Sequence, residues 1–495
     1  MAREQGRDPF LDRGRALCLA LDLHPQAAVR TLVRGLELLP RNGDWAQARV
    51  GVLGLGRSGR GALRLLARHD ADATAFDDRV DAATLDALLA DGLGHVQPLH
   101  AREDVSGRIH DLDVLVVSPG VPGNHPLIAA AEISGVVVIS ELELAWRRTR
   151  GAVVAVTGTN GKSTTVTLVH ALLAAAGHQC VVAGNIGIAL SDQVEQVDEG
   201  GVLVVECSSF QLERIMDFHP RVAAVLNVAP DHLDRYASFD DYVQAKHNLL
   251  RNQEPGDVFV YPADDERLGE WARNGVGRGA SFSMSPAGRP ESWVQDGMLM
   301  RRRDGGAEAL LEAAELSLLG APHLLNMTAA LACVAPWSID RDLLVPVLRE
   351  FQALPHRAVR VEGDERRTWI DDSKATNVHA ASATLSGLEG PVLLLAGGSG
   401  KDEDYGPLAS FADRVRCVLC FGAEGPAIRD ALQGQMQCEL HARMIDALVR
   451  ADELGREGDT ILLSPACASF DEFSGFAERG EVFANWVLEN VGGKA

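Results

Sequence analysis

Three short apolar segments of this chain each run into a cluster of glycines, at residues 48–59, 153–165 and 392–401. The apolar part of each segment is continuous rather than alternating, which is typical of parallel β-strands buried on both faces. A glycine turn after such a strand lets backbone N–H groups converge near a helix start, where anions are favoured. Helical patterns alternate with further apolar strands, such as 114–117 and 202–205. The sequence therefore predicts α/β architecture in three consecutive units.

The length of 495 residues also suggests about three domains. We expect a Rossmann-like unit at 48–145, a central P-loop-type unit with a mostly parallel sheet at 146–352, and a second Rossmann-like unit at 353–495. Residues 1–47 have apolar positions at helical spacing, which predicts a helical N-terminal extension.

Composition narrows the class of protein. Hydrophobic residues make up 46% and charged residues 23% of the chain, as in soluble globular proteins. The formal net charge is -22 and no block of five basic residues occurs, so nucleic acid and anionic membranes are not expected as partners. The opening residues contain no apolar signal-like region and no run of 18 apolar residues follows, which predicts a cytoplasmic protein.

The first glycine turn has the spacing G-x-G-x-x-G at Gly54, Gly56 and Gly59, with Asp77 and Asp78 after the next strand. This spacing matches the dinucleotide fingerprint, in which a carboxylate meets the ribose hydroxyls. By itself the pattern leaves three readings open: a nicotinamide cofactor, another nucleotide, or a tight turn without a ligand. An oxidoreductase is therefore the alternative function.

The second glycine turn resembles a phosphate loop that is shortened at its front. The usual pattern G-x-x-x-x-G-K-[ST] would need glycine at position 156, which is Val156. Gly158 and Gly161 remain where backbone must approach phosphate, and Lys162 supplies a positive charge. A capped helix after a turn would not explain a lysine beside two glycines, so the segment predicts a nucleotide site.

Acidic and imidazole side chains follow two neighbouring strands of the central unit. Glu206 ends the strand 202–206, and Asp231, His232 and Asp234 follow the strand 222–227. Taken singly, these residues could be turn or capping residues. Because the carboxyl ends of parallel strands meet on the ligand side of an α/β sheet, together they predict a metal site.

Ordered motifs across residues 48–491 resemble the Mur ligases, the ATP-dependent amide-forming enzymes of peptidoglycan synthesis. Folylpolyglutamate synthases share the shortened loop but usually follow its lysine with Gly-Ser, whereas here Ser163, Thr164 and Thr165 follow. The matching stretches are 158–164, 184–187, 206–213, 231–236, 354–357, 371–377, 397–401 and 464–473.

The stretches Asp-Ser-Lys-Ala-Thr at 372–376 and Pro-Ala-Cys-Ala-Ser at 465–469 resemble the branch of the family that adds D-glutamate. The resemblance implies UDP-N-acetylmuramoyl-L-alanine as acceptor, an acyl-phosphate intermediate, and release of ADP and phosphate. A Mur-type ligase that adds a different amino acid is the closer alternative. We also expect a monomer.

The resemblance assigns roles residue by residue. Lys162, His232, Lys246 and Lys374 are expected to be catalytic. ATP is expected at Gly158, Thr159, Asn160, Gly161, Lys162, Ser163, Thr164, Asn326, Arg357 and Asp372. Magnesium is expected at Ser163, Glu206, His232 and Lys246. The muramoyl substrate is expected at Asn185 and His232, and the amino acid at Thr376, Lys401, Ser469, Phe470 and Phe476.

Lys246 has two readings. From the residues alone it is an exposed lysine on a helix, whereas the family has at this place a lysine that carbon dioxide converts to a carbamate.

The sequence departs from the family pattern at one nucleotide contact. His323 and Leu324 stand where the family often has an asparagine that helps to hold adenine.

Overall fold

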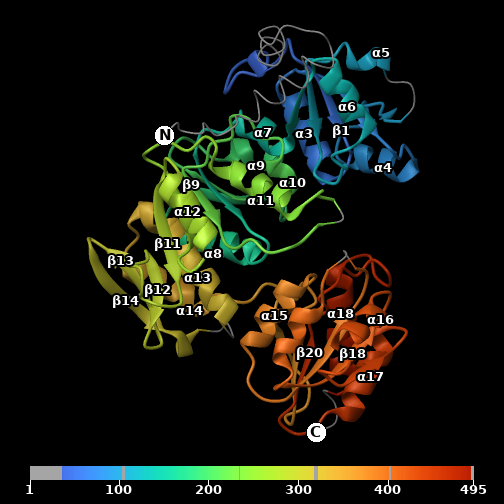
Figure 1. The fold of residues 1–495 in the computed structure, drawn as a ribbon. Helices are drawn as coiled ribbons and strands as arrows, with labels where there is room; N and C mark the ends of the chain where they lie inside the picture. The colour runs from blue at the N-terminus through green and yellow to red at the C-terminus, as the bar shows by residue number, and fades with distance from the viewer. Residues whose placement is uncertain (1–35, 103–105, 234, 317–320, 401–402, 492–495) are drawn as a thin grey trace, which may run out of the picture.

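The computed structural model describes residues 36–102, 106–233, 235–316, 321–400 and 403–491. Three sheets follow one another along the chain, as Figure 1 shows from the blue end to the red end. The predicted α/β class with three parallel-rich units is confirmed.

The first sheet has five parallel strands in the order β3-β2-β1-β4-β5. Its strands are β1 (Arg49–Leu53), β2 (Asp72–Asp77), β3 (Leu99–His100), β4 (Val114–Val117) and β5 (Val137–Ser140). Its helices are α3 (Arg57–Arg68), α4 (Ala82–Ala90), α5 (Ser106–Ile109), α6 (Pro126–Ile133) and α7 (Glu141–Trp146). The strand order reverses beside β1, so the first glycine turn lies at the point where such sheets bind ligands.

The second sheet has nine strands in the order β14-β13-β12-β11-β10-β9-β6-β8-β7. Its strands are β6 (Ala152–Thr157), β7 (Cys180–Gly184), β8 (Val202–Glu206), β9 (Val222–Val225), β10 (Val258–Pro262), β11 (Arg278–Ser283), β12 (Ser292–Gln295), β13 (Met298–Arg303) and β14 (Gly306–Glu312). The strands from β7 to β12 are parallel, and β13 and β14 extend the edge as an antiparallel hairpin. Its helices are α8 (Lys162–Ala175), α9 (Leu190–Gln193), α10 (Ser209–Leu212), α11 (Phe239–His247), α12 (Glu266–Asn274), α13 (Ala321–Val334) and α14 (Arg341–Glu350).

The third sheet has six strands in the order β15-β16-β20-β17-β18-β19, of which only β15 is antiparallel to its neighbour. Its strands are β15 (Val359–Val361), β16 (Thr368–Asp371), β17 (Val392–Gly397), β18 (Val415–Phe421), β19 (Cys438–Leu440) and β20 (Thr460–Leu463). Its helices are α15 (Val378–Ser386), α16 (Gly425–Leu432), α17 (Met444–Leu454) and α18 (Phe476–Asn490).

The apolar cores join the first two units and leave the third separate. One continuous cluster includes Val50 of β1 and Val153 of β6, whereas the two clusters of the third sheet contain residues of that unit only. Most of the expected N-terminal extension, residues 1–35, lies outside the described residues. Leu39 and Trp45, in the described part of that expected extension, are buried in the cluster that the first two units share. None of the described helices is both long and apolar enough to cross a membrane.

Candidate active site

A glycine loop connects β6 to α8. Val156 lies on β6, so the loop begins at Gly158, whose φ is +150°. Gly161 has a φ of +85°, a left-handed conformation that favours glycine, and a Cβ there would lie 2.3 Å from Oδ1 of Asn326. The first N–H groups of α8 have no intrahelical partner and are available to an anion. The backbone therefore has the properties of a phosphate site.

The side chain of Lys162 folds back onto this loop. Its Nζ donates hydrogen bonds to the carbonyl oxygens of Gly158 at 2.8 Å and Thr159 at 2.9 Å. The next residue, Ser163, is buried, and its Oγ accepts a hydrogen bond from Nη2 of Arg357 at 2.7 Å. Because Arg357 belongs to the third unit, this contact joins the loop to a residue that was expected to touch the nucleotide.

Glu206 ends β8 beside the loop, and 2% of its surface is exposed. Its Oε1 accepts a hydrogen bond from Nδ2 of Asn185 at 2.7 Å, whereas its Oε2 is buried and has no hydrogen-bond partner among the described residues. The backbone oxygen of Asn185 accepts a hydrogen bond from Nη2 of Arg57 at 3.2 Å, which links this edge to the first glycine turn. An anionic oxygen that is buried without a donor is a position that suits a cation.

Asp231 and His232 lie on the segment after β9. The carboxylate of Asp231 is buried, and Nε2 of His232 lies 3.6 Å from its Oδ2. The ring of His232 packs edge-on against that of Phe210, with centroids 4.8 Å apart. Within the described part of the chain, no three His, Cys, Asp or Glu side chains form a ready-made metal cluster. A cation here would therefore also need hydroxyl, water or modified-lysine ligands.

Lys246, on α11, is almost completely buried, with 1% of its surface exposed. Its Nζ donates a hydrogen bond to the Gly158 oxygen at 2.9 Å and lies 4.6 Å from the centre of the Tyr242 ring. Burial, and next the positive charge of Lys162, lower the pKa of Lys246 well below its ordinary value. The reading of this residue as an exposed helix lysine is therefore wrong.

A pocket lies between the central and third units. Its lining includes residues of the glycine loop together with Asn326 and His323 of α13, and Arg357, Asp372 and Lys374 of the third unit. Six residues that were expected to bind ATP, from segments far apart in the sequence, thus surround one space. They are Asn160, Gly161, Thr164, Asn326, Arg357 and Asp372, with Lys374 beside them.

Asp372 is held firmly in this pocket. Burial raises its pKa to about 7, although hydrogen bonds from Thr384 and Ser464 act in the opposite direction. The Oδ2 atom accepts those hydroxyl hydrogen bonds at 2.6 and 2.8 Å. Nearby, burial lowers the pKa of Arg357. A polyphosphate would therefore meet a partly neutral acid and a desolvated guanidinium.

The residues expected to bind the amino acid lie in the third unit. Ser469 is buried, Phe470 is 74% exposed, and Phe476 lies under Lys374, with Nζ 4.2 Å from the ring centre. The half-buried Thr376 donates its backbone N–H to the oxygen of Lys374 at 2.8 Å. Lys401 lies outside the described residues.

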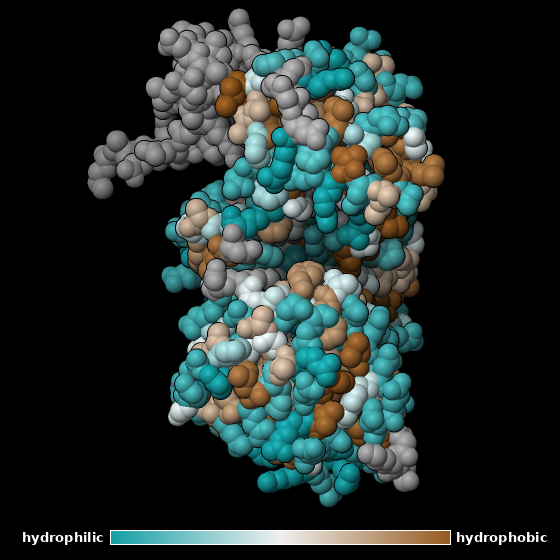
Figure 2. All heavy atoms as spheres, turned by 90° about the vertical axis from the view of Figure 1, so that its right-hand side faces the viewer, coloured by the Kyte–Doolittle hydropathy of each residue, from teal (hydrophilic) through white to brown (hydrophobic). Residues whose placement is uncertain are grey.

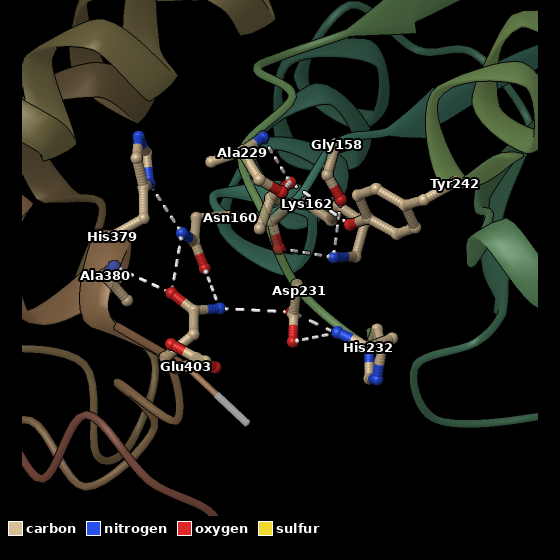
Figure 3. A network of polar contacts seen from close by, with 12 residues as sticks. Gly158, Asn160, Lys162, Ala229, Asp231, His232, Tyr242, His379, Ala380 and Glu403 are labelled. Atoms are coloured by element: carbon tan, nitrogen blue, oxygen red, sulfur yellow. Dashed lines mark hydrogen bonds and ion pairs between the residues drawn. The ribbon is translucent and has the colours of Figure 1, made fainter. Parts of the chain in front are cut away.

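Figure 3 shows a polar network between the central and third units in which Asn160 and Asp231 face His379 and the start of α15. Nδ2 of Asn160 lies 2.8 Å from Nδ1 of His379. Asn377 completes this network, and sequence reasoning gave it no role. Its place before a helix could have suggested a cap, but nothing in the sequence links it to residues more than 140 positions earlier.

Comparisons with known proteins match most of the chain to one family. Residues 48–140 match the Mur ligase MurD-like N-terminal domain, 156–334 the Mur ligase middle domain and 356–467 the Mur ligase glutamate ligase domain. A UDP-N-acetylmuramoylalanine–D-glutamate ligase from Salinibacter ruber is 37% identical over 459 residues, which cover 89% of this chain and 98% of the relative. The enzyme of that name from Alcanivorax borkumensis is 38% identical over 443 residues, covering 88% and 97% of the two chains.

Solved structures share the fold at lower identity. The MurF ligase from Thermotoga maritima in complex with ADP has a TM-score of 0.56 at 17% identity, covering 92% of this chain and 99% of that one. The UDP-N-acetylmuramate–alanine ligase MurC from Thermotoga maritima has a TM-score of 0.55 at 18% identity, covering 89% and 99%. The chain belongs to the Mur ligase family, in the group whose members are named UDP-N-acetylmuramoylalanine–D-glutamate ligases.

Proposed function

We propose that this protein joins D-glutamate to UDP-N-acetylmuramoyl-L-alanine at the expense of ATP, in the cytoplasmic synthesis of peptidoglycan precursors. The observation that carries the proposal is the 37% identity over 89% of the chain to a relative of that name. The nicotinamide enzyme suggested by the first glycine turn is not favoured, because residues 48–140 match the N-terminal domain of Mur ligases.

In the proposed reaction, the alanine carboxylate attacks the γ-phosphate of ATP to give an acyl phosphate and ADP. The amine of D-glutamate then attacks the acyl carbon, and phosphate leaves. The protein's part is to position the reactants and neutralise their charge. Lys162 would turn from the carbonyl oxygens of its loop to the phosphates, and Arg357 and Lys374 would bring positive charge from the third unit. Asn326 and Asp372 would hold the nucleoside.

We assign Mg²⁺ to Ser163, Glu206, His232 and a carbamylated Lys246. The free Oε2 of Glu206 supports this assignment, because a buried carboxylate oxygen without a donor suits a hard cation. When bound, the ion would supply charge neutralisation at the transferred phosphoryl group. The lowered pKa of Lys246 supports the carbamate, because only the neutral amine can form a bond to carbon dioxide, with loss of a proton.

The amino-acid substrate is assigned to the third unit, at Thr376, Lys401, Ser469, Phe470 and Phe476. Lys401 would pair with a carboxylate of glutamate. Asn185 and His232 would face the muramoyl substrate, because Asn185 lies between Glu206 and Arg57 of the first glycine turn.

We further propose that the protein acts as a monomer without nucleic-acid or membrane partners. The proposed domains are an N-terminal extension at 1–47, a UDP-substrate domain at 48–145, an ATP domain at 146–352 and an amino-acid domain at 353–495. The separate apolar clusters of the third sheet support the last of these boundaries.

The test is phosphate release by the purified full chain with ATP, Mg²⁺, UDP-N-acetylmuramoyl-L-alanine and D-glutamate. We expect release only when both substrates are present, together with a product whose mass equals acceptor plus glutamate minus water. L-Glutamate and a diamino acid are the matched controls. Ligation of either control in preference to D-glutamate, or binding of NADH but not ATP, would overturn the proposal.

A further inference from the structure

The interface between the central and third units is bridged by the side chain of Asn377. Its amide pairs with that of Asn160 through two reciprocal Nδ2–Oδ1 hydrogen bonds, both of 3.3 Å. Its Nδ2 also donates to Oδ2 of Asp231 at 3.2 Å. One side chain of the third unit thus contacts both the glycine loop and the segment that contains His232.

Asn160 is fixed from two sides. Asn227, in its own unit, holds its backbone, since Oδ1 accepts from the Asn160 N–H at 2.8 Å and Nδ2 donates to the Asn160 oxygen at 3.1 Å. Its side chain turns the other way, toward Asn377 and His379. The next residues in the chain are Gly161 and Lys162, so the position of the third unit acts directly on the part of the loop expected to hold phosphate.

The orientation of the Asn377 amide is determined by a further hydrogen bond, within the third unit. Its Oδ1 accepts the N–H of Ala380 at 2.8 Å and so caps the N-terminus of α15. The oxygen is therefore on the α15 side, and the two N–H groups of Nδ2 are free to face the central unit. Asn377 is 3% exposed and Asp231 is 5% exposed, so a carboxylate in place of this amide would meet another carboxylate with little water between them.

We infer that Asn377 is a positioning residue, which couples docking of the third unit to the geometry of the glycine loop and of the Asp231–His232 segment. The inference rests on the proposed function, because its purpose is to bring Arg357 and Lys374 over the loop for phosphoryl transfer. A role as a helix cap alone would use only Oδ1, and the contacts of Nδ2 would then have no effect on catalysis.

The test separates capping from bridging. Asp and Ser cap helices about as well as Asn, so α15 should stay folded in Asn377→Asp and Asn377→Ser, which far-ultraviolet circular dichroism checks. Asn377→Asp places a negative charge against Asp231, and we expect kcat to fall about tenfold or more, equivalent to about 1.4 kcal/mol. Asn377→Ser should cause a smaller loss. The KM for the muramoyl substrate should change less than kcat, because His232 is next to Asp231 but its other proposed contact, Asn185, pairs with Glu206.

Two further variants make the result specific. Asn377→Asp combined with Asp231→Asn restores an amide–carboxylate pair with the donor and acceptor exchanged, and should recover part of the lost kcat. Asn490→Asp introduces the same charge at an exposed position of α18, where Nδ2 contacts the Trp486 oxygen, and should leave activity unchanged. Wild-type kcat in Asn377→Asp, or a double variant no better than Asn377→Asp, would overturn the inference. An inactive wild type would instead refute the proposed function.

Discussion

At the scale of single residues, Glu206 is the simplest test of the metal assignment. Glu206→Ala removes an anionic ligand, and we expect ATP turnover to fall by about 10²–10³-fold, as when one group that stabilises the transition state is lost. The unfolding temperature should fall little, because Oε2 has no donor and the hydrogen bond lost is the one from Asn185 to Oε1. Glu312→Ala, at the exposed end of β14, is the matched control. A magnesium-dependent Glu206→Ala enzyme with normal turnover would contradict the assignment.

Lys246 supports a second prediction. Lys246→Ala should be nearly inactive, and added acetate or formate should partly restore turnover by taking the place of the carbamate oxygens. Lys246→Arg should also fail, because a guanidinium stays charged and cannot react with carbon dioxide. Turnover measured against carboxylate concentration checks this, with Lys374→Ala as the control, since an anion cannot replace a lost cation. Full activity of Lys246→Arg would exclude a carbamate.

The same residues show what a sequence can predict at this scale. The glycines, the lysine and the strand-end carboxylate follow from backbone geometry and ligand chemistry. The burial of Lys246 does not, because a helix of nine residues does not reveal which of its faces is covered by the loop at Gly158. The role of Asn377 is hidden for the same reason, since its partner Asn160 is 217 positions away.

At the scale of elements, α18 organises the candidate amino-acid site through one side chain. Arg479 is completely buried and donates hydrogen bonds to the backbone oxygens of Ser373, Gly397, Cys467 and Ala468. These oxygens lie at the end of β17 and in the loops that follow β16 and β20. Burial lowers the pKa of Arg479 to about 10, so the guanidinium remains charged at neutral pH. The planar group therefore fixes the end of β17 relative to the loops that follow β16 and β20.

Arg479→Lys should disturb this arrangement, because an ammonium has fewer N–H donors than a guanidinium and lacks its planar, forked geometry. We expect the unfolding free energy of the third unit to fall by about 2–4 kcal/mol, given the cost of hydrogen bonds lost from a charged group. The KM for D-glutamate should rise more than the KM for ATP. Arg450→Lys, on α17 and paired with Glu439 and Glu453, is the control and should change neither quantity. Equal effects of the two substitutions, measured by denaturant unfolding and steady-state kinetics, would refute this role.

The elements themselves were predictable where the pattern was strong. Each of the three apolar segments with a glycine turn forms a buried strand, because continuous apolar runs fit a sheet covered on both faces. The sharing of one apolar core by the first and central units was not predictable. Periodicity indicates that a face is apolar, but it does not indicate which unit covers that face.

At the scale of the whole molecule, the two interfaces between units differ in kind. The first and central units share apolar core residues, whereas the third unit meets the central unit through polar contacts such as those of Asn377 and Arg357. Figure 2 shows the surface hollowed between the third unit and the rest, with hydrophilic residues on the upper side of the hollow. Polar interfaces between domains permit relative motion, whereas a shared core does not. The third unit is therefore the one that should move.

Because the loop residues and Arg357, Asp372 and Lys374 line one pocket from two units, ligands should draw those units together. We expect the radius of gyration from small-angle X-ray scattering to fall when a non-hydrolysable ATP analogue and the muramoyl substrate are added. The muramoyl substrate alone should have a smaller effect, since its proposed contacts lie in the two units that already share a core. Asn377→Asp should compact less than wild type at saturating ligand, and Asn490→Asp should compact as the wild type does. Scattering curves that do not change with both ligands would show that the units are already fixed, and closure could not then be a step of the reaction.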